Sequence, residues 1–149
     1  MLLRKIKRFL HIPFRKKLLY IEAYFNLARA RILKAMPFSR VSRLLGEEWL
    51  ETAQEDSEDL SIKRDVAKAI TTISKYTIWE SACLVQAIAA MKMLERRNIE
   101  STLYMGTAKD DAGKLIAHAW LRSGTAYISG GKIMHNFTVV RVFAKLLEK

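Results

Sequence analysis

Residues 79–87, WESACLVQA, are the stretch from which the fold of this chain is best interpreted. They hold the only cysteine, Cys83, placed where an apolar helical pattern begins. Downstream, AHAW at residues 117–120 puts His118 in a segment that alternates as a strand does. The positive end of a helix dipole favours a thiolate at a helix start, and a nearby imidazolium favours it further. We therefore interpret Cys83 and His118 as a nucleophile and its general base, the minimum equipment for covalent acyl transfer.

Plainer interpretations of both residues stay open. A single cysteine on an apolar helix is most often a small buried hydrophobic residue, and a lone histidine in a strand is most often structural. The combination favours chemistry, because the residues between Cys83 and His118 suffice for one helix and one strand. A thiol active site needs the two side chains to be adjacent in space and not in sequence.

Four segments carry a resemblance to a known family: residues 79–87, MLERR at 93–97, LYMG at 103–106 and AHAWL at 117–121. Together they resemble the transglutaminase-like leader peptidases of lasso peptide biosynthesis. The N-terminal half resembles the same family through MPFSR at 36–40 and LLG at 44–46. The resemblance implies an α+β, papain/transglutaminase-like fold. In such a fold a helical layer carries the catalytic cysteine at a helix N-terminus and packs on a small antiparallel sheet that carries the histidine.

The resemblance also implies the reaction and its partners. A cysteine peptidase of this kind removes the leader from a lasso precursor peptide, using neither metal nor organic cofactor, and an ATP-dependent cyclase acts on the product. A chain this short is expected to lack the leader-binding domain and to depend on a separate small leader-recognition protein. The alternatives are an acyl transferase with an amine in place of water, a catalytically impaired transglutaminase-like binding module, and a basic membrane- or nucleic-acid-binding protein.

The third catalytic residue is where the chain departs from the family pattern. The resemblance places an Asp about a dozen residues after the histidine, where this chain has Ser129, Gly130 and Gly131. The group that orients His118 is then Ser129, Asn136, a backbone carbonyl or a residue from a partner. For the oxyanion we expect the backbone N–H of Cys83. Further candidates for oxyanion or substrate contacts are Trp79, Gln86 and Trp120.

The charge of the chain is concentrated in its first third. Of the net charge of +11 over 149 residues, residues 1–45 supply twelve Lys and Arg against Glu22 alone. We expect a basic helical segment at 1–46, an acidic connector at 47–60 and a cysteine peptidase core at 61–149. One cysteine excludes an intramolecular disulfide and, with three histidines, argues against a dedicated zinc site. A reducing, cytoplasmic setting is expected, with membrane association through the N-terminal helices as an alternative.

Three interpretations of the basic segment stay open. It is a solvated charged face, an amphipathic segment on an anionic membrane or acidic partner, or a nucleic-acid-binding element, which ranks last because no recognised motif supports it. An export signal is not expected, because Arg15, Lys16 and Lys17 interrupt the apolar run that it would need. The same three residues are our candidates for docking an acidic partner.

Periodicity predicts the remaining elements. A short helix, a bend at Pro13 and a second helix to about Met36 come first, and a short helix follows around Trp49. Ser61 is expected to cap a helix that begins at Ile62, and the helix that carries the cysteine is expected to end near Asn98. Strands are predicted at 99–106, 115–122, 125–129 and 137–143, followed by a short C-terminal helix.

Overall fold

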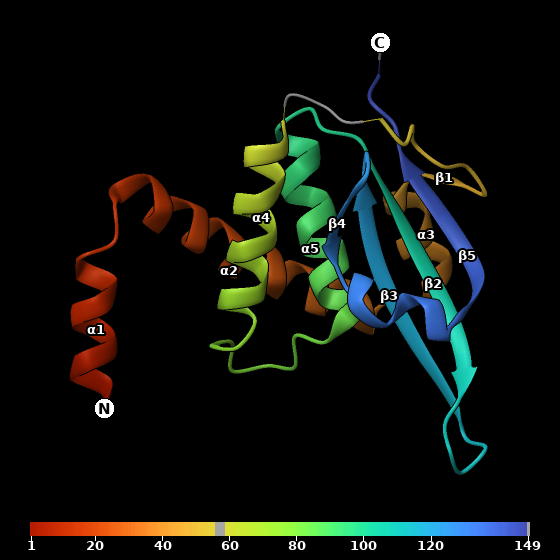
Figure 1. Ribbon diagram of the computed structural model, residues 1–149, viewed down its shortest axis with the longest axis horizontal. Helices are drawn as coiled ribbons and strands as arrows, with labels where there is room; N and C mark the ends of the chain where they lie inside the picture. Colours follow the sequence, from red (N-terminus) through yellow and green to blue (C-terminus); the bar gives the residue numbers. More distant parts are fainter. Residues whose placement is uncertain (56–58, 149) are drawn as a thin grey trace.

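The structure is a computed structural model that describes residues 1–55 and 59–148, and it confirms the predicted α+β class (Figure 1). Helices come first in the chain and most of the strands last. The helices are α1 (Leu2–Leu10), α2 (Phe14–Ala35), α3 (Phe38–Leu45), α4 (Leu60–Ile73), α5 (Cys83–Arg96) and the 3₁₀ helix η1 (Gly131–Asn136). The strands are β1 (Glu47–Glu48), β2 (Ser101–Lys109), β3 (Leu115–Ser123), β4 (Ala126–Ser129) and β5 (Thr138–Lys145).

The five strands form one antiparallel sheet in the order β1-β5-β2-β3-β4. Tyr104 of β2 lies opposite Trp120 of β3 on one side and Val142 of β5 on the other. The turn between β2 and β3 is closed by Asp110, whose carboxylate accepts hydrogen bonds from the backbone N–H groups of Ala112 and Lys114. Side chains two residues apart in a strand share a face, so the side chains of each strand divide between two clusters, one on each face of the sheet.

The main core lies between the helices and one face of the sheet. Leu103, Leu121 and Phe143 project from three neighbouring strands into this core, where α5 contributes a nearly continuous run of buried residues. The opposite face carries a smaller cluster of Tyr104, Trp120 and Val142, against which residues near η1 pack. The sheet is therefore covered on both faces, by helices on one and by η1 and its flanking residues on the other.

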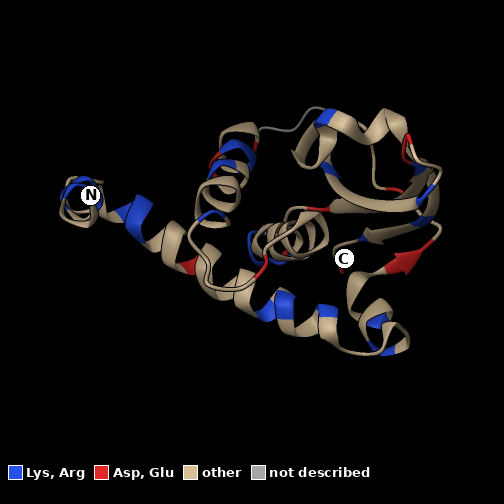
Figure 2. Cartoon of the chain, turned by 90° about the horizontal axis from the view of Figure 1, so that it is seen from below, with Lys and Arg blue, Asp and Glu red and all other residues tan. Residues whose placement is uncertain are grey.

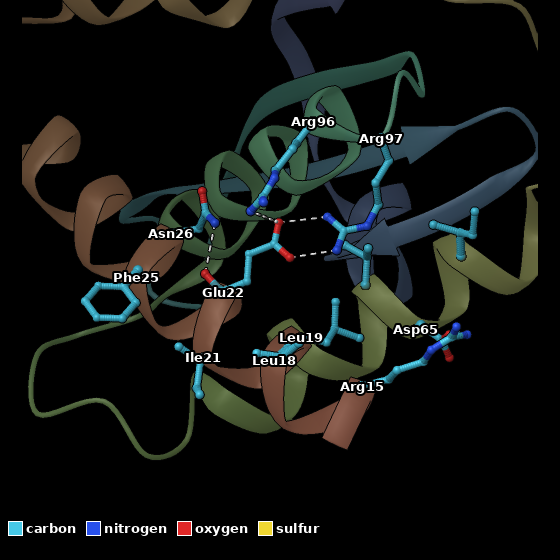
Figure 3. A pocket seen from close by; sticks show the side chains of 12 residues that line it. Arg15, Leu18, Leu19, Ile21, Glu22, Phe25, Asn26, Asp65, Arg96 and Arg97 are labelled. Carbon is cyan, nitrogen blue, oxygen red and sulfur yellow. Dashed lines mark hydrogen bonds and ion pairs between the residues drawn. The ribbon is translucent and has the colours of Figure 1, made fainter. Parts of the chain in front are cut away.

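One ion pair joins α2 to the C-terminal end of α5. Arg97, just beyond α5, donates two hydrogen bonds to the carboxylate of Glu22, at 2.8 and 2.6 Å (Figure 3). The hydrogen bonds that Arg97 donates to Glu22 raise the pKa of Arg97 more than its burial lowers it. A planar guanidinium that grips both carboxylate oxygens restrains the rotation of one helix against the other.

Three local predictions from the sequence are wrong. No helix surrounds Trp49: this residue has φ +64° and directly follows β1, and its N–H donates to Val142 O at 2.8 Å. The C-terminal helix is absent among residues up to 148, because β5 continues pairing with β2 as far as Lys145. Ser61 lies inside α4, which begins one residue after Asp59. In the first two cases, pairing with a distant strand decides the structure. In the third case, the helix begins one residue before Ser61.

The predicted bend at Pro13 separates α1 from α2. Helix α5 ends at Arg96, and Asn98, with φ +56°, follows in a left-handed conformation. Within the described ranges, no helix is both long enough and apolar enough to cross a lipid bilayer.

Candidate active site

Cys83 is the first residue of α5, as the sequence predicted. The residue before it, Ala82, is extended and gives no side-chain cap to the helix, whose first backbone hydrogen bond runs from Gln86 N–H to Ala82 O at 3.0 Å. The first N–H groups of an α-helix have no partner inside the helix. The half-buried thiol of Cys83 therefore lies beside a helix start that favours negative charge.

The approach to Cys83 is held by a polar turn. The hydroxyl of Thr77 lies 2.8 Å from that of Ser81 and 2.9 Å from Trp79 O. Gln86, a candidate for a substrate contact, instead donates its side-chain amide to Ser81 O at 2.8 Å. The amide of Gln86 thus fixes the chain immediately before the helix.

Trp79 packs its ring against Tyr24 of α2, with the ring centroids 5.0 Å apart. Its indole Nε1 is buried and has no hydrogen-bond partner within the described part of the chain. An indole N–H is only a donor, and burying it without an acceptor costs free energy. Trp79 is therefore a donor without an acceptor, four residues before Cys83.

His118 lies in β3 with its ring between two aromatic side chains. The ring centroid is 5.8 Å from that of Trp120 and 5.0 Å from that of Phe137. Its Nε2 lies 2.7 Å from Gly130 O. Since a carbonyl only accepts, we assign the hydrogen to Nε2, which leaves Nδ1 to accept a proton. Trp120, the third candidate for a substrate contact, is almost fully buried beneath this ring.

The partner of His118 stands twelve residues after it, where the resemblance placed an Asp. Gly130 has φ +68° and ψ 6°, a left-handed conformation that turns its carbonyl toward the ring. The hydroxyl of Ser129 is buried and has no hydrogen-bond partner among the described residues, and Asn136 is exposed at the end of η1. Among the groups considered for orienting His118, the backbone carbonyl is the one that contacts it.

Cys83 and His118 belong to different faces of the sheet. Cys83 packs against the main core, whereas the contacts of His118 are with the smaller cluster on the opposite face. No hydrogen bond joins the two residues in the described structure. α5 and β3 run side by side (Figure 1), with Cys83 as the first residue of α5 and His118 as the fourth residue of β3. β4 pairs with only residues 121–123 of β3, so residues 115–120 have no partner strand on that side within the described chain.

A polar network that sequence reasoning missed supports the aromatic stack beneath His118. Tyr104 stacks on Trp120 with the ring centroids 5.5 Å apart and nearly parallel. Its hydroxyl donates to the carboxylate of Glu51 and accepts from Nε of the buried Arg122 at 3.0 Å. The signal available was the alternation of β3, which puts Arg122 on the same face as His118 and Trp120.

We expect Tyr104 to ionise only at high pH. Its burial, together with the hydrogen bond to Glu51, raises the pKa of Tyr104 to about 12, although Arg122 opposes this. Because the folded value exceeds the unfolded value of about 10, this term stabilises the fold fully below pH ~10 and is lost as the pH rises to ~12. The loss amounts to at most about 3 kcal/mol. Absorbance titration at 295 nm should show a late-ionising component that belongs to Tyr104.

The control for this titration is Tyr127, which, unlike the buried Tyr104, lies on the surface. Tyr104→Phe should remove the late component, whereas Tyr127→Phe, at a half-exposed side chain, should leave it in place. A late component that survives Tyr104→Phe would contradict the assignment.

The candidate docking residues lie far from Cys83. Arg15 borders an open cavity of about 770 Å³ between α2, α4 and the C-terminal end of α5 (Figure 3). Lys16 borders a smaller cavity with Asp65 and Lys68. Lys17 donates to Leu10 O at 3.1 Å. Since α5 has 14 residues, the end with this cavity is about 20 Å from Cys83.

The fold and the site define an α+β protein with a cysteine at a helix start and a histidine in the adjoining sheet. The sequence profile of the Transglutaminase-like superfamily matches residues 23–142, which include Cys83, His118 and Gly130. The chain belongs to this superfamily, whose members include cysteine peptidases. Neither a curated protein nor a solved structure matches the chain.

Proposed function

We propose that this protein is a cysteine peptidase that removes the leader from a lasso precursor peptide. The observation that carries the proposal is the uncapped start of α5 at Cys83, within a superfamily domain whose histidine is held by Gly130 O. The thiolate of Cys83 attacks the scissile carbonyl, and the N–H groups at the helix start stabilise the oxyanion. The unpartnered Nε1 of Trp79 is a further candidate donor.

Proton transfer is assigned to His118. Its Nδ1 accepts the thiol proton and returns it to the leaving amine, which departs as the thioester forms. Water then attacks the thioester, with Nδ1 taking its proton, and the thiol is restored. The net change is one water added across one peptide bond. The step requires Cys83 and His118 to meet at the unpaired edge of β3, and catalytic hydrogen bonds commonly tighten only when substrate binds.

The substrate and the partners follow from the resemblance to lasso leader peptidases. The precursor is cut between leader and core, a separate small protein presents the leader, and an ATP-dependent cyclase takes the product. Arg15, Lys16 and Lys17 are proposed to dock the leader-recognition protein. Their distance from Cys83 suits a partner that holds the leader while the adjoining bond reaches the thiol.

Mass spectrometry of a precursor peptide tests the proposal, with and without its recognition protein. Wild type should cut one bond, and Cys83→Ala and His118→Ala should each slow the cut by about 10³-fold or more. His135→Ala is the matched control, because His135 is an exposed histidine in η1. No cleavage by a folded wild type under either condition would overturn the proposal.

A second measurement tests contact between the two residues without substrate. The pH dependence of Cys83 alkylation by iodoacetamide should change in His118→Ala and stay unchanged in His135→Ala, because only a neighbouring imidazole alters the thiolate fraction. Identical profiles for wild type and His118→Ala would mean that the two side chains do not interact before substrate binds, and the cleavage assay alone would then decide the role of His118.

A binding module without catalysis is the second candidate. The observation that favours it is the partner of His118, which is the carbonyl of Gly130 where the family pattern has a carboxylate. This candidate predicts that Cys83→Ala leaves every measured binding constant unchanged and that no precursor bond is cut.

A further inference from the structure

Helix α1 stands away from the rest of the chain, and every one of its residues is exposed (Figure 1). Its composition is divided between two faces. At 100° per residue, the apolar side chains fall within an arc of about 120°, and the cations fill the remainder. The apolar set is Leu2, Leu3, Ile6, Phe9 and Leu10, and the basic set is Arg4, Lys5, Lys7 and Arg8.

The outward face of α2 continues this pattern. The face that packs on α4 and α5 carries its buried residues, and the opposite face carries a row of large apolar side chains between 47% and 73% exposed. This row is Phe14, Leu18, Ile21, Phe25 and Ile32. These side chains share an arc of about 60°. Lys17 and Arg29 border the row, and Figure 2 shows basic residues along both helices.

The exposed apolar faces of α1 and α2 are not explained if both helices face only water. Contiguous exposed apolar surface marks an interaction site, whereas scattered apolar residues do not. A helix as short as α1, with 9 residues, is marginal in water without a packing partner. The contacts that α1 makes with the chain are peripheral, such as Lys5 over the ring of Tyr76 and Lys17 over that of Phe9. A surface outside the chain is needed to bury the apolar side of α1.

We propose that α1 lies in the headgroup region of an anionic lipid bilayer, and that the outward row of α2 extends the contact. Four cations and no acid flank the apolar arc of α1, which is the arrangement that attracts anionic headgroups while the apolar side chains enter the acyl boundary.

A folded protein partner fits α1 less well. Such a partner needs a shaped recess, and α1 lines none of the cavity of about 770 Å³. Leu18, Ile21 and Phe25 of the outward row of α2 do border that cavity, so the poorer fit of a protein partner is specific to α1. A bilayer accommodates a convex helix without any recess. The inference stands independently of the peptidase proposal, because it uses no residue of the candidate active site.

Vesicle sedimentation of the full chain tests the inference. Binding is expected to vesicles of phosphatidylcholine with one quarter phosphatidylglycerol and to be weaker by at least tenfold to phosphatidylcholine alone. Ile6→Gln with Phe9→Gln should weaken binding by at least about tenfold. The matched control is Leu115→Gln with Leu146→Gln, two apolar side chains exposed elsewhere, which should change nothing.

Charge is tested with a second pair of variants. Arg4→Gln with Lys7→Gln should weaken binding to the anionic vesicles by about 25-fold, at about fivefold for each cation. Lys109→Gln with Lys114→Gln, at the turn between β2 and β3, is the control for net charge. Equal losses for the two pairs would overturn the assignment to α1.

Depth is tested by Phe9→Trp. Emission from the new indole should shift to shorter wavelength on anionic vesicles and be quenched by brominated acyl chains, beyond the quenching of the three native tryptophans. Absence of binding to anionic vesicles at low salt, or binding without added quenching, would overturn the proposal. Capture of α1 by an acidic protein in the absence of vesicle binding would do the same.

Discussion

Arg122→Met is expected to lower the free energy of unfolding by about 3 to 5 kcal/mol. The side chain of Arg122 is only 3% exposed, and it joins the segment before α4 to the sheet. Its guanidinium donates to the following acceptors: Tyr104 OH at 3.0 Å, Gly124 O at 2.8 Å, Ala53 O at 3.3 Å, Thr52 O at 3.0 Å, Glu51 Oε2 at 3.3 Å and Thr102 Oγ1 at 3.4 Å.

The loss of stability comes from the buried hydrogen-bond acceptors that the substitution leaves without a donor. Methionine fills much of the volume but donates nothing, so several buried acceptors lose their partner at once. The stack of Tyr104 on Trp120, beneath His118, loses the cation that fixes the phenol oxygen. We therefore expect the midpoint of thermal unfolding to fall by about 10 °C.

Arg141→Met is the matched control for this measurement. Arg141 also pairs with a carboxylate, that of Glu48, and lies over the ring of Phe38, but its side chain is 46% exposed. An ion pair so exposed contributes about 0 to 1 kcal/mol. Denaturant unfolding of both variants decides the matter, and equal losses would show that burial of Arg122 adds nothing.

Much of the fold could be predicted from local patterns. α2 was visible from its apolar periodicity between Pro13 and Pro37, and β3 from the alternation around His118. Two of the three errors arose where pairing across the chain decides the structure. β5 extends to Lys145 because β2 offers it a partner, and Trp49 follows a short strand because β5 does the same for residues 47–48. Neither pairing can be recognised from the local sequence.

The candidate site was predictable to the extent that it depends on side-chain type. Cys83 could be located at a helix start because an apolar helical period begins there. The carbonyl that contacts His118 could only be offered among alternatives, since every residue has one and its direction depends on the φ angle at Gly130. The acceptors of Arg122 escaped prediction because several lie about 70 residues away in the chain.

Gly130→Ala is expected to release His118 and to slow the proposed cleavage by about 10²-fold, short of the loss reported for triads that lose the correct tautomer. A Cβ at this position would lie 2.5 Å from Ala119 O and 3.0 Å from Nε2 of His118, in a backbone conformation that disfavours side chains. The loop must move, and the hydrogen bond from Nε2 to Gly130 O lengthens or breaks.

Gly113→Ala separates this local effect from general backbone strain. Gly113 has φ +80°, and a Cβ there would meet nothing within 4 Å. Both substitutions should cost about 1 to 2 kcal/mol for the left-handed conformation. Only Gly130→Ala should change the imidazole nitrogen shifts of His118 in long-range ¹H–¹⁵N spectra, where the Nε2–H tautomer is recognised directly. Unchanged spectra would mean that the loop takes up the Cβ without releasing His118, and changed spectra together with full activity would mean that the contact with Gly130 O is not needed for cleavage.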